Sequence, residues 1–284
     1  MKKIVLILSL VLVASSNSFS QRDVDNQLLN KLSTYNENST SKTIVEEAGK
    51  KWWQTLLDII TVAGADIGGA YAGVVGSSHI IGAVGLATGG LGAAIVGGAA
   101  GLLGGAGASN AAWHGVHRPV SGSLGYGNLS ISVPAEFNYL SNEGRNNNYV
   151  LHNFFINSGN ITDFYRTFLD DEQIKVMVSQ PMNDLKSSIE ESVTNNFATV
   201  ESTSFGSFCS DLVRKGLMTR MGQSTLNLFF EKYRRCNSPE SMQGLINYYI
   251  AEIYNSSVSV LEKRSLIASL MVASESPFYW GAPR

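Results

Sequence analysis

Hydrophobic residues recur every three or four positions along much of the chain, and this spacing predicts a mainly α fold. The pattern is clearest in residues 149–284, which are numerous enough to bury a helical core. Within this region Ser238, Pro239 and Glu240 form a helix start signal, with a capping serine and an early proline. One expected helix ends at Phe168, and another starts at Ser238. Further helices are expected at 170–179, 182–197, 205–219, 222–235 and 258–273. Pro181 is expected to interrupt the helical pattern, and Pro277 is expected to end the last helix.

The N-terminal and middle parts of the chain have weaker patterns. Residues 21–42 are polar and predict one weak helical stretch at 24–32, followed by a flexible linker at 35–42. Residues 114–148 are expected to form a second linker. Alternating apolar residues within it predict one short strand that ends at Pro134, and these residues are Leu129, Ile131 and Val133.

A Gly-rich segment separates these two parts. Residues 64–107 hold 16 of the 28 glycines, and residues 67–117 contain no Asp, Glu, Lys or Arg. Glycine destabilises a water-exposed helix by about 1 kcal/mol relative to alanine, so glycines at helical spacing indicate close backbone packing. The segment predicts a hairpin of two helices, 59–77 and 80–108, each long enough to cross a membrane. The expected helix-packing residues are Gly64, Gly68, Ala72, Gly76, Gly85, Gly89, Ala93, Gly97, Gly101 and Gly105.

An amphipathic helix is expected just before this hairpin, and together they form a predicted unit at 43–113. Its Lys50, Lys51, Trp52 and Trp53 are candidate membrane-interface residues, because lysine and tryptophan favour the lipid headgroup level. Alanine and glycine are only weakly hydrophobic, so two alternatives stay open. The hairpin inserts into a membrane, or it is buried in the core of its own protein.

The first 20 residues have the features of a secretory signal peptide. Lys2 and Lys3 precede an apolar run at 4–14, and small residues stand before a cleavage point ahead of Gln21. Export to the periplasm, the outer envelope or the medium is therefore expected, with possible membrane association. Only 15% of the residues are charged and the net charge is -2, which argues against a nucleic-acid partner.

Few residues suggest chemistry. Cys209 and Cys236 are the only cysteines, and an exported chain permits either a disulfide or two buried thiols. His114 and His117 have ligand-like spacing, but no further ligand lies near them in sequence. No nucleotide-binding loop and no catalytic motif is present, so neither an enzyme nor a metal or other cofactor is expected.

Three short motifs give the chain a family resemblance. Ala65, Asp66, Gly68 and Gly69 open the hairpin, the Gly/Ala-rich stretch 83–108 follows, and a Leu-His-Asn step occurs at 151–153. With the signal ending before a glutamine, these motifs resemble a group of uncharacterised secreted proteins of the Bacteroidota. Phe154 and Phe155 depart from that group, where a more acidic step is typical. The hairpin alone resembles the paired helices of two-peptide bacteriocins.

The resemblance implies no known activity. It implies a shared role for Asp66, His152 and Asn153, most simply a buried polar contact between the hairpin and the C-terminal helices. The function expected from the sequence is membrane insertion or anchoring through the glycine zipper, in a bacteriocin-like or pore-forming manner. The alternative is an exported interaction protein with its hairpin buried. Expected partners are lipid, a second copy of the chain, or an unidentified protein.

Overall fold

The computed structural model describes residues 25–39, 62–78, 129–137, 172–197 and 203–280. These residues contain seven α-helices and no strand, which confirms the mainly α fold. Two helices cover 25–38 and 62–78. The others are α6 (Glu172–Phe197), α7 (Thr203–Arg214), α8 (Arg220–Tyr233), α9 (Pro239–Asn255) and α10 (Val260–Trp280), and a short 3-10 turn, η2, covers Ala135–Phe137.

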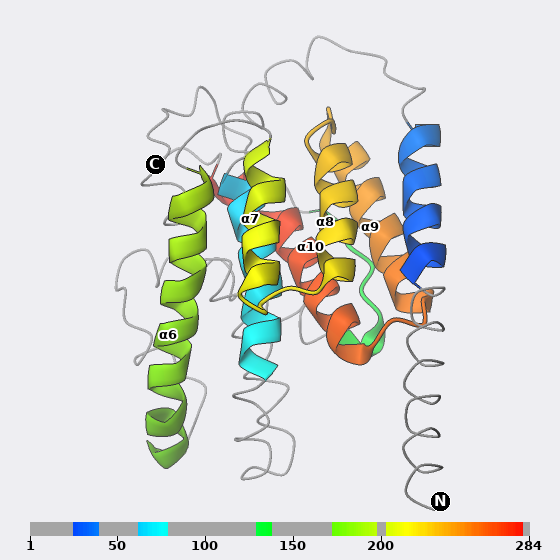
Figure 1. Ribbon diagram of the computed structural model, residues 1–284. Helices are drawn as coiled ribbons and strands as arrows, with labels where there is room; N and C mark the ends of the chain where they lie inside the picture. Colours follow the sequence, from blue (N-terminus) through cyan, green and yellow to red (C-terminus); the bar gives the residue numbers. More distant parts are fainter. Residues whose placement is uncertain (1–24, 40–61, 79–128, 138–171, 198–202, 281–284) are drawn as a thin grey trace, which may run out of the picture.

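Helix 62–78 lies inside the bundle, between α6 on one side and α8 and α10 on the other (Figure 1). Every residue from 62 to 75 is buried, and its apolar side chains belong to the same hydrophobic core as those of α6–α10. A helix that is apolar on all sides needs protein or lipid around its whole circumference. In this structure protein surrounds the described part of the Gly-rich segment.

Helix 25–38 covers the outer side of α8 and α9 (Figure 1). Leu28 and Leu32 are buried, as the weak apolar face at 24–32 predicts. The helix continues past that face, so the linker expected from residue 35 is wrong for residues 35–38. Tertiary contacts explain the extension, because Tyr35 stacks on Tyr248 with ring centroids 3.8 Å apart and Asn36 donates to Tyr249 Oη at 2.9 Å.

Prolines do not end the two helices in which they occur. The break expected at Pro181 is wrong, because α6 runs through it and buries Met182, Leu185 and Ile189 on one continuous face. The end expected at Pro277 is also wrong, because α10 continues to Trp280 and buries Phe278. Proline destabilises a helix interior, so burial of these apolar faces has to outweigh that local penalty.

Capping residues set two of the observed helix ends. Ser238 caps α9, because its Oγ accepts a hydrogen bond from Ser241 N at 3.2 Å. The Ser238 amide in turn donates to Ser241 Oγ at 3.2 Å. This capping box confirms the helix start predicted there. α7 ends at Arg214, earlier than the predicted residue 219. Gly216 has φ 70°, and Leu217 N bonds to Leu212 O at 2.8 Å, the arrangement of a Schellman C-cap.

Candidate functional site

The glycines of helix 62–78 receive side chains from three neighbouring helices. A Cβ at Gly64 would lie 3.0 Å from Phe230 Cζ, and one at Gly68 would lie 2.5 Å from Phe208 Cε1. At Gly76 the nearest side chain is Leu185. The first glycine ridge therefore permits close approach, and what approaches is an aromatic or leucine side chain of α6, α7 or α8. The other ridge, Gly85, Gly89, Gly97, Gly101 and Gly105, lies outside the described residues.

Contacts along helix 62–78 define its direction in the bundle. Gly64 meets Phe205 near the start of α7 and Gly68 meets Phe208 one turn later, so these two helices run parallel. Gly222 near the start of α8 meets Tyr71, and Phe230 near its end meets Gly64, so α8 runs antiparallel. Helix 62–78 therefore has one parallel neighbour, α7, and one antiparallel neighbour, α8, as is common in a helical bundle.

Asp66 is buried in the middle of this apolar surface, at 1% exposure. Ser276 of α10 donates a short hydrogen bond to Asp66 Oδ2. The carboxylate contributes to the raised pKa of Tyr233, although burial is the largest cause of that shift. Asp66 therefore links the Gly-rich helix to α10, whereas His152 and Asn153, the partners that the resemblance implies, lie outside the described residues.

A second buried polar cluster joins helix 62–78 to both α8 and α10. Tyr71 Oη donates to Glu262 Oε1 at 2.7 Å, and Thr219 Oγ1 donates to Glu262 Oε2 at 3.0 Å. Thr219 also caps α8 by accepting from Gly222 N at 2.8 Å. Burial raises the pKa of Glu262, while its bonds from Tyr71 and Thr219 oppose that rise and Asp25 adds to it. Burial likewise raises the pKa of Tyr71.

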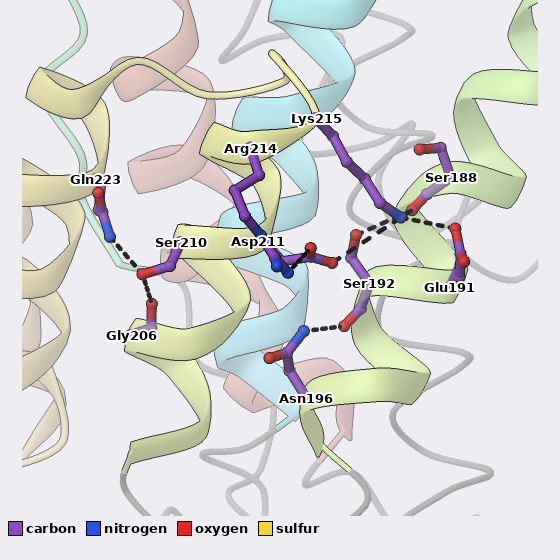
Figure 2. Close-up of polar contacts among 10 residues, drawn as sticks. All are labelled: Ser188, Glu191, Ser192, Asn196, Gly206, Ser210, Asp211, Arg214, Lys215 and Gln223. Atoms are coloured by element: carbon purple, nitrogen blue, oxygen red, sulfur yellow. Dashed lines mark hydrogen bonds and ion pairs between the residues drawn. The ribbon is translucent and has the colours of Figure 1, made fainter.

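The interface between α6 and α7 holds a different polar cluster (Figure 2). Arg214 donates to Asp211, and Lys215 bridges Ser188 O at 2.9 Å and Glu191 Oε2 at 2.8 Å. Burial would raise the pKa of Asp211, but hydrogen bonds from Ser192 and Arg214 and the charge of Lys215 hold it below its ordinary value. Hydrogen bonds and ion pairs within this cluster therefore join α6 to α7.

The short strand predicted to end at Pro134 does not form: the chain is extended there, and the described residues contain no strand that could pair with it. Its apolar alternation is present, because Leu129 is buried while Ser130 and Ser132 are exposed. Side-chain amides of α9 accept the backbone hydrogen bonds that a neighbouring strand would otherwise accept. Gln243 Oε1 accepts from Ser130 N at 2.7 Å, and Asn247 Oδ1 accepts from Ser132 N at 2.9 Å. The two amides stand four residues apart on one helix face, which matches the spacing of alternate strand amides.

Both cysteines are free and buried, so this structure contains two thiols and no bond between them. Burial raises the pKa of the Cys209 thiol, and it raises that of Cys236 to about 11. A thiol with a raised pKa is mostly protonated at neutral pH and is a poor nucleophile. Neither cysteine is therefore activated for chemistry here.

The remaining predicted site residues lie outside the part of the chain that the structure describes. These are the interface candidates Lys50, Lys51, Trp52 and Trp53, together with His114 and His117. Among the residues that are described, no group of acidic, histidine and cysteine side chains is arranged to hold a metal ion. Within the same residues, no helix combines the length and apolarity that a membrane crossing requires.

Sequence reasoning missed the cluster of Tyr71, Thr219 and Glu262. One signal was present in the last helix, where Glu262 stands four residues before Leu266 and so shares its apolar face. An acid at such a position is expected to need hydroxyl or amide partners.

Comparisons of the chain with protein-family models, curated proteins and solved structures found no match.

Proposed function

We propose that this protein acts by physical association, as an exported interaction protein whose C-terminal helices hold the start of its Gly-rich segment inside a protein core. The burial of helix 62–78 carries this proposal. Phe208 and Leu185 pack against the backbone of this helix at two of its glycines. Tyr71 of the helix packs against Gly222 of α8 in the same way. Two buried carboxylates then fix the orientation of the helix, through Asp66 to Ser276 and through Tyr71 to Glu262.

The alternative function is membrane insertion or anchoring, with the same helices shielding the segment until release. The charge-free stretch 67–117 favours it, because so long a run without Asp, Glu, Lys or Arg is unusual outside lipid. In this alternative the glycines on the second ridge drive close association of helices. A Gly97→Leu, Gly101→Leu double variant should then lose its oligomers and its leakage activity.

Carbonate extraction separates the two proposals. Full-length protein is expressed with its own N-terminus, cells are fractionated, and the membranes are washed with carbonate at high pH. If the helix stays in its own core, the protein leaves the membranes in the wash, and the purified protein releases no dye from anionic liposomes. Retention in the washed membranes together with dye release would overturn the interaction proposal and support insertion.

A further inference from the structure

The segment 129–137 is bound to α9 through its main chain (Figure 1). Gln243 Oε1 accepts a hydrogen bond from Ser130 N at 2.7 Å. Asn247 Oδ1 accepts from Ser132 N at 2.9 Å, and Asn247 Nδ2 donates to Ser130 O at 3.1 Å. None of these three bonds involves a side chain of the segment, so α9 recognises the course of the segment's main chain.

The spacing of the two amides on α9 fits the repeat of an extended chain. Residues four apart in an α-helix are about 6 Å apart along its axis, and alternate residues of an extended chain are about 6.6–6.8 Å apart. Gln243 and Asn247 therefore meet two successive amides on one side of the segment. The match ends there, because Pro134 has no N–H to donate and Ala251, four residues after Asn247, has no side-chain acceptor.

Apolar residues anchor both ends of the segment. Leu129 and Phe137 are each 3% exposed and belong to the hydrophobic core. The ring of Phe137 meets Tyr254 of α9 edge to face, with the centroids 6.2 Å apart. Ile131 and Val133 are partly buried against the same core, whereas the serines beside them are exposed. A ligand of this face therefore needs alternating apolar residues followed by an aromatic residue, and the positions between them are unrestricted.

The segment can leave α9 without exposing a polar group that depends on it. Its hydrogen bonds to α9 lie at the surface, so water replaces them. Withdrawal of helix 62–78 would instead leave the buried carboxylate of Glu262 without Tyr71. What holds the segment is chiefly the burial of Leu129 and Phe137, which another peptide of the same pattern supplies equally well.

We propose that this face of α9 is a binding site for an extended apolar peptide of a partner protein, and that segment 129–137 occupies the site as a displaceable strap. The inference rests on the proposed function, because it assigns a surface and a class of partner to an interaction protein. Gln243 and Asn247 bind the main chain of the partner segment, and its apolar side chains take the places of Leu129 and Phe137. Strap and partner compete, so the apparent affinity for the partner decreases with the fraction of sites that are empty.

A fluorescein-labelled peptide of residues 127–138 is the probe, and fluorescence anisotropy with the full-length protein measures its binding. Leu129→Asp in the protein puts a charge where a buried leucine lies and should release the strap. The peptide should then bind this variant at least about tenfold more tightly than the parent protein. The same peptide with methylated amides at Ser130 and Ser132 should lose about tenfold in affinity or more, because it cannot donate to α9.

Variants of α9 test the same contacts from the protein side. Gln243→Ala combined with Asn247→Ala, in the Leu129→Asp protein, should weaken binding as much as methylation of the peptide does. Gln223→Ala is the matched control, because it removes an amide of α8 that donates to Ser210, and it should leave binding unchanged. If Leu129→Asp does not fold, Leu129→Ala provides the same comparison with a smaller gain in affinity.

Three results would be informative against these proposals. Equal binding of the methylated and unmethylated peptides, or no binding to either Leu129 variant, would overturn the peptide site. A parent protein that is dimeric, with a monomeric Gln243→Ala, Asn247→Ala variant, would overturn it in favour of exchange of the segment between copies. These two results leave the proposed function in place, whereas retention in carbonate-washed membranes with dye release would overturn that function whatever the peptide does.

Discussion

Asp211 and Glu262 are buried to the same extent, at 6% exposure, yet their surroundings give them opposite behaviour. Asp211 lies between α6 and α7 beside Arg214 and Lys215, whereas Glu262 has hydroxyl partners at the edge of helix 62–78. The pKa of Asp211 is lowered despite its burial, and the pKa of Glu262 is raised by its burial. Low exposure alone therefore does not decide the protonation of a carboxyl group: hydrogen bonds and cationic neighbours hold the pKa of Asp211 down, whereas burial is the largest cause of the rise at Glu262.

The two interfaces respond to pH in opposite directions. Asp211 contributes stability that is present above its ordinary pKa of 3.8 and is lost as pH falls through the folded pKa. Glu262 contributes stability that is complete below 4.5 and is lost as pH rises. At neutral pH the α6–α7 interface therefore has its full electrostatic support, while the interface of the Gly-rich helix does not.

The largest loss of stability is expected from Gly222→Ala, which disturbs the packing of Tyr71 and its bond to Glu262. The new Cβ would lie under 3.0 Å from the ring and hydroxyl of Tyr71, which is fully buried. Overpacking of this kind destabilises by about 1–3 kcal/mol, and here it also displaces the hydroxyl that bonds to Glu262. Urea denaturation at neutral pH measures the loss.

Gly206→Ala in α7 is the matched control for that substitution. Its nearest heavy atom is Asn227 Oδ1, 4.0 Å from the new Cβ, so no neighbour has to move. Equal stability of Gly222→Ala and the parent protein would contradict the packing of Tyr71 against α8. A loss of similar size in both variants would instead indicate a general sensitivity of these helices to alanine.

The sequence predicted the helical class well because amphipathic spacing is a local property. The faces of α9 and of helix 25–38 were correctly placed, and so was the Ser238 cap. The two proline breaks were wrong because local propensity was opposed by tertiary contacts, such as the bond from Ser276 to Asp66 next to Pro277. The prediction of a strand at 129–133 was wrong, because side chains of α9, and not a neighbouring strand, bond to the amides of Ser130 and Ser132.

The candidate site was only partly predictable. The glycine ridge indicated close packing at Gly64, Gly68 and Gly76, and all three have side chains close to their backbones. The identity of those neighbours was not available, because glycine spacing specifies an approach distance and not the residue that approaches. Tyr71 and Glu262 are 191 residues apart, and no local pattern relates positions at that separation.

A smaller effect, with the opposite pH dependence, is expected from Asp211→Asn. At neutral pH the variant should lose roughly 1 kcal/mol, a limited amount because Arg214 is 77% exposed and solvent screens its charge. The difference from the parent protein should shrink as pH falls below 3.8 and should disappear only below the lowered folded pKa, where the carboxyl group is protonated in both states. Thermal unfolding measured across this range provides the comparison.

Asp184→Asn is the control, because Asp184 accepts a bond from Gln180 at an exposed position on α6. It should leave the pH profile of the parent protein unchanged. A loss for Asp211→Asn that persists at low pH would contradict the electrostatic explanation and indicate a packing defect.

The smallest effect is expected at Gly244 of α9. Gly244 is exposed in the interior of α9 and a Cβ there would meet no heavy atom within 4 Å, so Gly244→Ala should stabilise by roughly 0.5–1 kcal/mol. Gly216→Ala also meets no atom, yet it should destabilise because φ 70° strains an L-residue. Thermal melts of the pair separate conformational cost from steric cost. If both variants were stabilised alike, the left-handed cap of α7 would be contradicted.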